Sequence, residues 1–478
     1  MNFDREQTGT LLSEEELWSL QEKVNAMGPR LTGCAAHNAY IDLLKTQLES
    51  YGLTVHEDEH PFVKWQAKRW GLAVQGQDGV VEELPTTFYY PYSGQTPESG
   101  VTGDLVYCKN SAAGFQKAKG KIAVVQVAIP SVPTSLILKK RHVYPAGTKL
   151  PATLSNAVIG SVLRGPKLAE AAKAGVLAVI CVWGQYSSQN AAGQVLPFTT
   201  GYQGCPGLWV DEKTGERLRE FARRGAKATL VLEAEVDRSA ASKTLYCVLP
   251  GQTVKETVII NTHTDGPNAC EENGGIALLS LARYFANHPQ RNRTFVFVFA
   301  TGHFQIPQFG VGKGQASSRW LKNHPELWDG TGTNARAVAG VTMEHLGCSE
   351  WRDNAAHSDY KQTNPIELEL VYTGNQAMED IYLRALKNRT TVRSVTLRPR
   401  NSIYFGEGQP LYQAGIPTIS LVPGPDYLCK ETPNGEIDKL NPVLMKEQID
   451  TFFTLLLEID RTPAQQLGKP QKQSLGIW

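Results

Sequence analysis

The sequence predicts an α/β protein with a mostly parallel mixed sheet and helices on both faces, and its second half carries the clearest evidence. Apolar runs of buried-strand type (ETVIIN, RTFVFVFAT, AVAGVTMEHLG) alternate with helical stretches such as GGIALLSLARYFANH. This alternation is typical of a parallel sheet covered on both sides. IELELVYTG and IPTISLV continue the pattern, with helices expected near 376–387 and 443–459. Two amphipathic helices are expected at the start, over 14–27 and 38–51.

The length of 478 residues exceeds what a single hydrophobic core usually organises. Between residues 100 and 236, short β-like runs alternate with Gly- and Pro-rich turns, and one helix, GPKLAEAAKAG, interrupts them. This segment has the size of a separate domain. We therefore expect residues 1–99 and 237–478 to form one catalytic domain, with a β-rich α/β domain inserted over residues 100–236.

Composition argues against several classes of protein. The net charge is +1 and no run of Lys or Arg occurs, so we expect no nucleic-acid partner. No apolar stretch reaches the roughly 18 residues of a membrane span. The first ten residues, MNFDREQTGT, lack the apolar region of a secretion signal, which indicates a cytoplasmic protein. The eight cysteines are scattered without a CxxC and are expected to be free thiols.

Several predicted strands end in side chains that can bind a metal. His263 and Asp265 follow ETVIIN, His303 follows RTFVFVFA, and Glu344 and His345 lie at the end of the third strand. Each residue alone has an ordinary structural explanation as a polar turn or a solvated strand end. Because ligands bind beyond the carboxyl ends of parallel strands, their convergence predicts a metal site.

A pair of glutamates adds to this set. Glu271 and Glu272 come directly before the helix that is expected to open at Gly274. A carboxylate in this place could simply stabilise the helix N-terminus. It could also join His263 in binding a cation, and the sequence does not decide between the two.

At these residues the sequence resembles the zinc aminopeptidase family, which also contains glutamate carboxypeptidases and glutaminyl cyclases. VIINTHTDGPNACEENGGIALLSLARYF is similar to the block that holds the family's first metal ligand and bridging carboxylate. PRLTGCAAHNAYIDLLKTQLESYGLTVHED resembles its N-terminal helix, and FGEGQPLYQAGIPTISLVPGPDY and ETPNGEIDKLNP resemble two later segments. KLAEAAKAGVLAVICV and CPGLWVDEKTGERLRE resemble the protease-associated domain inserted in such enzymes.

The resemblance implies five metal ligands, which are His263, Glu272, His303, Glu344 and Glu431. It also implies that Asp265 lies behind the first of them as a catalytic-site residue. Four of these positions differ in residue type from the family, yet all five can bind a metal, which predicts a rebuilt site for one or two divalent ions. The family's preference implies zinc. Imidazole and carboxylate ligands also suit manganese, iron or cobalt.

The family's general-base glutamate falls on Gly302, which cannot accept a proton. Glu407 is the first candidate to replace it, and His345 is the second. Tyr404 or Tyr427 could donate hydrogen bonds to an oxyanion, although each of these four side chains could equally be a structural polar residue.

The sequence thus favours a metal-dependent hydrolase of an amide or peptide-like bond, acting on a small-molecule or peptide-like substrate. Two alternatives stay open. One is a metal-dependent lyase or transferase, which would need no water-activating base, and the other is a non-catalytic binding protein on a peptidase scaffold. The substrate and the oligomeric state do not follow from the sequence.

Overall fold

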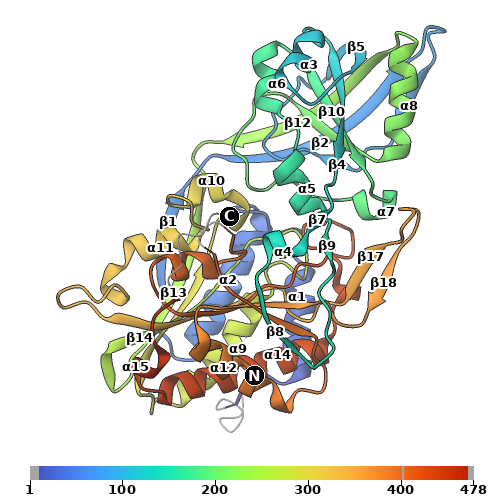
Figure 1. Cartoon of the computed structure of the whole chain (residues 1–478). Helices are drawn as coiled ribbons and strands as arrows, with labels where there is room; N and C mark the ends of the chain where they lie inside the picture. The colour runs from blue at the N-terminus through green and yellow to red at the C-terminus, as the bar shows by residue number, and fades with distance from the viewer. Residues whose placement is uncertain (1–9, 401–402, 472–478) are drawn as a thin grey trace.

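The computed structural model describes residues 10–400 and 403–471, and two sheets organise this part of the chain (Figure 1). The main sheet has nine strands in the order β1-β13-β15-β14-β16-β21-β19-β20-β8. Its strands are β1 (His56–Pro61), β13 (Ala241–Leu249), β15 (Arg293–Ala300), β14 (Thr253–His263), β16 (Arg336–Met343), β21 (Thr418–Leu421), β19 (Glu369–Thr373), β20 (Ser394–Leu397) and β8 (Lys140–Tyr144).

The α/β class and the mixed sheet are confirmed. The neighbouring strands β15, β14, β16 and β21 run parallel, as do β19 and β20. The outer pairs β1–β13, β13–β15 and β20–β8 are antiparallel, and so is β19–β21. Parallel pairing is therefore concentrated at the centre, where the carboxyl ends of β14, β15 and β16 lie side by side.

Helices cover both faces of the main sheet. Alternate residues of β14 show this, since Val258 and Ile260 belong to one core and Ile259 to another. The larger core contains α1 (Glu14–Asn25), α2 (Ala35–Ser50), α9 (Gly274–Asn287), α12 (Gln376–Ala385), α14 (Pro442–Arg461) and α15 (Ala464–Leu467). The opposite face carries α10 (Ile306–Phe309), α11 (Ser317–Asn323) and α13 (Gly408–Gln413).

The second sheet has eight strands in the order β3-β2-β12-β5-β6-β10-β11-β4 and lies above the main sheet in Figure 1. Its strands are β2 (Lys64–Gln75), β3 (Val81–Leu84), β4 (Phe88–Tyr89), β5 (Val101–Tyr107), β6 (Ile122–Ala128), β10 (Ala178–Gly184), β11 (Gly207–Val210) and β12 (Lys227–Asp237). Its helices are α3 (Ala112–Lys117), α5 (Ala157–Arg164), α6 (Leu168–Ala174), α7 (Ser188–Ala191) and α8 (Glu212–Arg223).

The second sheet does not keep to the expected 100–236 boundaries. It already includes β2, which pairs antiparallel with β12 along its length, from Lys64 opposite Asp237 to Gln75 opposite Lys227. Conversely, β8 leaves the inserted segment and adds an edge strand to the main sheet beside β20. Both pairings join segments far apart in sequence, which local patterns do not reveal.

The remaining short elements connect these layers. They are β7 (Val132–Pro133), α4 (Thr134–Ile137), β9 (Thr153–Leu154), the hairpin β17 (Glu350–Asp353) and β18 (Tyr360–Asn364), and the 3-10 turns η1 (His303–Gln305), η2 (Pro325–Leu327), η3 (Leu386–Asn388) and η4 (Ile437–Lys439). Asp353 of the hairpin accepts hydrogen bonds from the amide and hydroxyl of Ser187, at 2.9 and 2.6 Å, which ties it to the start of α7.

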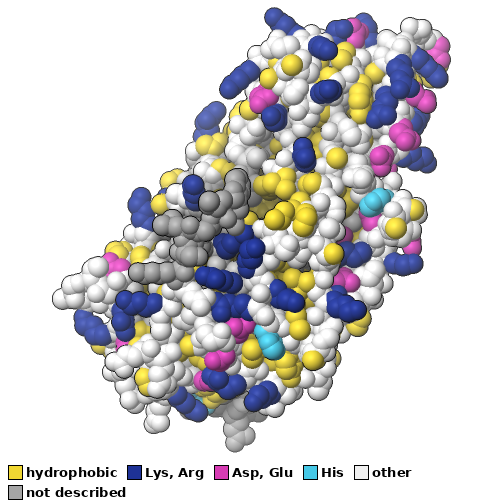
Figure 2. Space-filling model, in the orientation of Figure 1, with side chains coloured by type: hydrophobic (Ala, Val, Ile, Leu, Met, Phe, Trp, Pro, Cys, Tyr) yellow, Lys and Arg dark blue, Asp and Glu magenta, His cyan; other side chains and the backbone are white. Residues whose placement is uncertain are grey.

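All eight cysteines lie in the described part of the chain, and all are free thiols, as predicted. Among the described residues, no helix combines the length and apolar character needed to cross a membrane. Figure 2 shows Lys and Arg spread over the visible face among Asp and Glu, with hydrophobic side chains gathered near α5, where Val162 and Leu163 are exposed.

Candidate metal centre

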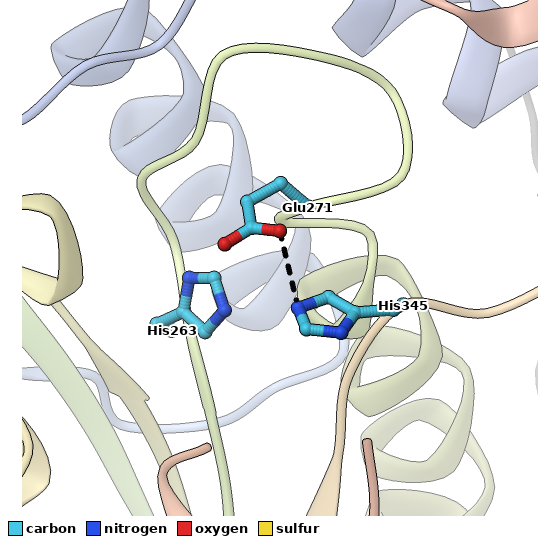
Figure 3. A group of neighbouring side chains, drawn as sticks. All are labelled: His263, Glu271 and His345. Carbon is cyan, nitrogen blue, oxygen red and sulfur yellow. Dashed lines mark ion pairs between the residues drawn. The ribbon is translucent and has the colours of Figure 1, made fainter. Parts of the chain in front are cut away.

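Three buried side chains converge beyond the carboxyl ends of the central strands. His263 ends β14, Glu271 lies in the loop before α9, and His345 follows β16 by two residues. One ligand atom from each lies within 4.8 Å of the others, and the three side chains point toward one another (Figure 3). None is more than 3% exposed. His263 and Glu271 are close in sequence, whereas His345 comes from a distant segment that the parallel sheet brings beside them.

Backbone carbonyls fix both imidazole rings in the tautomer that suits a metal ligand. The Nδ1 of His263 donates to the carbonyl of Asp265 at 2.9 Å, and the Nδ1 of His345 donates to that of Pro423 at 2.7 Å. Each ring thereby keeps an unprotonated Nε2. Burial lowers the pKa of His263 to about 3 and that of His345 well below its ordinary value, so both rings are neutral near pH 7.

Several ligand-type atoms at this centre have no partner. His263 Nε2, Glu271 Oε2, Glu344 Oε2 and His345 Nε2 are buried and make no hydrogen bond. His345 Nε2 lies 3.3 Å from Glu271 Oε2, but a neutral ring with no proton on that nitrogen forms neither an ion pair nor a hydrogen bond there. Because buried polar atoms are almost always satisfied, these four atoms fit a bound cation. Burial also raises the pKa of Glu271, so its carboxylate needs a nearby positive charge to ionise.

Glu344 borders this group. Its Oε1 accepts the amide of Glu407 at 2.6 Å, and its Oε2 lies 4.0 Å from His345 Nε2. The close approach depends on Gly406, where φ is +79° and an added Cβ would overlap Glu344 Oε2. Burial raises the pKa of Glu344 to about 7. Glu344, a predicted ligand, therefore lies at the edge of the cluster.

Glu272, a predicted ligand, lies outside the group of three, and its Oε2 is buried without a hydrogen-bond partner. Its carboxylate accepts a hydrogen bond from Arg30 Nε at 2.7 Å, and both side chains are fully buried. Burial would raise the pKa of Glu272 further, but the guanidinium limits it to about 7. Consecutive residues of a loop point in different directions, so Glu271 faces the cluster while Glu272 compensates Arg30.

His303 lies beside the cluster and outside the group of three. Its ring stacks on His263 with centroids 4.1 Å apart, and its Nε2 lies 4.0 Å from Glu271 Oε1. Its Nδ1 donates to Glu407 Oε1 at 2.6 Å. Burial alone would lower the pKa of His303, but the bond to Glu407 and the surrounding carboxylates raise it to about 9. In this arrangement His303 is a cation near pH 7.

Glu407 anchors His303 and has little capacity left for another role. Besides the imidazole, its carboxylate accepts the amides of Ser317 at 2.7 Å and Ala316 at 3.2 Å. Burial acts to raise the pKa of Glu407, but His303 and these amides hold it below the ordinary value. The carboxylate predicted to replace the general base is thus committed to positioning a neighbouring ring.

Asp265 also acts as an anchor. Its carboxylate accepts the amides of Gly302 and His303 at 3.1 Å each and that of Phe304 at 2.9 Å. The hydroxyl of Thr32 donates a fourth bond at 2.5 Å. Asp265 therefore fixes the loop after β15 against the end of β14, and its backbone carbonyl, not its carboxylate, orients His263.

The position at which the sequence resemblance implies a general base, Gly302, is closed by packing. Gly302 has φ +94°, and a Cβ at this residue would overlap the ring of Phe309. Tyr404 and Tyr427 are buried and engaged elsewhere, with Ser420 at 2.6 Å and with the carbonyl of Ser349 at 2.9 Å. Neither tyrosine takes the predicted place of an oxyanion donor.

Glu431, the fifth predicted ligand, is not brought into the group of three. It lines two neighbouring cavities of about 240 and 310 Å³. Its carboxylate has no hydrogen bond or ion pair with any residue that the structure describes. Burial raises the pKa of Glu431 to about 7.

Solved structures of peptidases share this fold over nearly the whole chain. BSAP, a zinc aminopeptidase from Bacillus subtilis, superposes with a TM-score of 0.63 at 16% identity, covering 95% of this chain and 97% of that one. An aminopeptidase from Aneurinibacillus sp. strain AM-1 gives 0.61 at 17% identity, with 98% and 96% covered. A peptidase M28 precursor from Shewanella amazonensis SB2B gives 0.62 at 14% identity, with 94% and 97% covered.

The chain therefore has the fold of the zinc aminopeptidases, as its sequence predicted. Neither the family models nor the curated proteins provide a match. Sequence reasoning considered Glu271 and Glu272 together but assigned the ligand position to Glu272, and it did not single out Arg30. The sequence carried no signal for this choice, because the burial of Arg30, which requires a carboxylate partner, is visible only in the structure.

Proposed function

We propose that this chain is a metal-dependent hydrolase that cleaves an amide or peptide-like bond. The observation that carries the proposal is the set of four buried, unpartnered ligand atoms at the carboxyl edge of the main sheet. The similarity in fold to a zinc aminopeptidase supports zinc as the ion and a peptide-like molecule as the substrate.

His263, Glu271 and His345 would hold one divalent ion, with Glu344 at the margin of the site. Three protein ligands that leave a position open are typical of catalytic zinc sites. When bound, such an ion supplies Lewis acidity, which polarises a carbonyl group and lowers the pKa of water. The neutral rings of His263 and His345 are already in the form that binds a metal.

Two side chains of the centre would take part in the reaction beside the metal ligands. His303, held by Glu407, places a cationic ring 4.0 Å from Glu271, where it would stabilise negative charge that develops on the substrate oxygen. Among the carboxylates of the centre, Glu344 keeps a free oxygen whereas Glu407 does not. Glu344 is therefore the side chain best placed to accept a proton.

One observation favours a second candidate function, a metal-dependent lyase or transferase. The packing of Phe309 against Gly302 leaves no space for a side chain at the position where the sequence resemblance implies a general base. A reaction that uses a metal only to polarise a carbonyl group does not need this base. Product analysis separates the two functions, because hydrolysis incorporates water into the products and the alternative does not.

Three finer predictions stay proposals. The second sheet, formed mostly by the segment between the two parts of the main domain, is proposed to be a protease-associated domain, on the basis of its sequence resemblance. Zinc is preferred over manganese, iron or cobalt. A cytoplasmic location also stays a proposal.

The proposed function is tested with the full chain, zinc and a panel of aminoacyl p-nitroanilides and dipeptides. We expect hydrolysis that falls at least about a hundredfold in His263→Ala, because one ligand is lost. His288→Ala, which truncates an exposed ring, serves as the matched control and should retain activity. Zinc-loaded protein that cleaves no amide, or metal-free protein that cleaves them equally well, contradicts the proposal.

A further inference from the structure

A cavity of about 240 Å³ lies where the two sheets of the chain meet. Its walls come from β2, β4, the loop that follows Pro29, and η1. The cavity borders the metal centre through Phe198 and Phe304, since the ring of Phe198 lies 5.5 Å from that of His303. Thr32, another wall residue, donates to Asp265. A group bound in the cavity would therefore lie next to the proposed reaction site.

Aromatic rings dominate the walls. The rings of Trp65 and Tyr89 lie 5.7 Å apart, those of Trp70 and Tyr89 lie 4.9 Å apart, and Phe198 stacks on Phe304 at 4.8 Å. The six aromatic wall residues are Trp65, Trp70, Tyr89, Tyr92, Phe198 and Phe304. Aromatic faces attract cations, and cages of this composition bind ammonium groups.

The charges on the walls favour a cation. Glu431 is the lone carboxylate among the wall residues, and it makes no ion pair within residues 10–400 and 403–471. The ammonium of Lys64 lies 3.9 Å from Asp237, which compensates it. The thiol of Cys34 is neutral, since burial raises its pKa. Above the pKa of Glu431, about 7, the uncompensated charge of the cavity is therefore negative.

We infer that this cavity binds an organic cation, the ammonium or guanidinium group of a basic side chain, with Glu431 as its counter-charge. The inference rests on the proposed function, because the cavity would be the subsite that selects the substrate of the hydrolase. It makes Glu431 a specificity residue in place of a metal ligand. Trp65 and Tyr89 enclose the apolar stem of the same side chain, and the metal centre lies beyond Phe198.

Direct binding tests this inference without reference to catalysis. Benzylamine and benzyl alcohol, two probes of similar shape, are titrated calorimetrically into the zinc-loaded full chain at pH 8, and again after chelation. We expect benzylamine to bind about tenfold more tightly, or roughly 1.4 kcal/mol. Glu431→Gln should abolish the preference, and Glu59→Gln, which neutralises an exposed carboxylate of β1, should keep it. Equal affinities, or a preference that survives Glu431→Gln, overturn the inference.

Kinetics separate this inference from the proposed function. The zinc-loaded chain should hydrolyse lysine p-nitroanilide with a kcat/KM about tenfold above that for leucine p-nitroanilide, and Glu431→Gln should remove the difference. Hydrolysis of both substrates with no preference contradicts the inference alone. Amine binding that depends on Glu431, in a protein that cleaves no amide, contradicts the proposed function and leaves the cation site standing.

Discussion

Parallel strands of the two sheets carry opposite kinds of side chain at their carboxyl ends. In the main sheet, β14 ends in His263, and Glu344 and His345 follow β16, all buried and polar. In the second sheet, Trp183 of β10 and Trp209 of β11 stack at 3.8 Å and are fully buried. Buried polar groups reduce stability unless they are compensated, so their concentration at one sheet marks that sheet as the functional one. The ends of β10 and β11 are packed as a scaffold, and the second sheet contributes to the proposed cation site through the aromatic side chains of β2 and β4.

The largest expected effect tests how strongly the polar end of the main sheet depends on its compensating charges. Arg30→Ala should lower the free energy of unfolding by about 3–5 kcal/mol, because it leaves Glu272 buried without its partner. Urea titration measures this change. Arg336→Ala removes a guanidinium that is 57% exposed and should change stability by less than about 0.5 kcal/mol. Equal effects of the two substitutions would show that the polar end of the main sheet does not depend on its buried ion pair.

The apolar end of the second sheet should depend on packing alone. Trp183→Leu is expected to lower the free energy of unfolding by about 2–3 kcal/mol, because it removes a buried ring and its stack with Trp209. Bound metal per folded chain should stay unchanged. A loss of metal that parallels the loss of stability would mean that the second sheet also shapes the metal centre.

Packing next to the metal centre can be tested at Gly302. Gly302→Ala places a Cβ against the ring of Phe309 and should lower the free energy of unfolding by about 1–3 kcal/mol. Gly312→Ala is a matched control, since Gly312 also has a positive φ, +65°, but no neighbouring atom within 4 Å. The difference between the two variants isolates the overlap from backbone strain. Equal effects would show that Phe309 does not close this position.

The smallest effect concerns the boundary between the two sheets. Burial raises the pKa of Glu431 from 4.5 to about 7, so the folded state holds this proton more tightly than the unfolded state. The carboxyl group therefore weakens folding progressively as the pH rises from about 4.5 through 7. Relative to the native chain, Glu431→Gln should gain about 1–2 kcal/mol between pH 5 and pH 8. Urea titrations at both values measure the gain, and no gain would place the carboxylate in water.

The sequence predicted the main sheet because its buried strands and amphipathic helices are locally encoded. His263, Glu344 and His345 were singled out because polar residues directly after such strands must lie at one edge. His345 was predicted as a substitute base, whereas its ring joins His263 and Glu271 in the group of three. The pairing of β2 with β12 was not predicted, because it joins residues separated by more than 150 positions. Such long-range pairing depends on the folded topology.

The direction of individual side chains was also beyond the sequence. Nothing in EEN distinguishes Glu271, which faces the cluster, from Glu272, which faces Arg30. Glu431 lies in an irregular segment, where no helix or strand period fixes which way a side chain points. Phe309 closes the space at Gly302 because the short helix α10 packs its last residue against the loop after β15. This contact depends on the three-dimensional structure and has no pattern in the sequence.

Elemental analysis of the full chain, purified without chelators, tests the central claim most directly. We predict about one divalent ion per chain, zinc in preference to others, and its loss in His263→Ala. Protein that contains no metal and takes up none when titrated with zinc would contradict the claim. The four unpartnered atoms around His263 would then need another explanation.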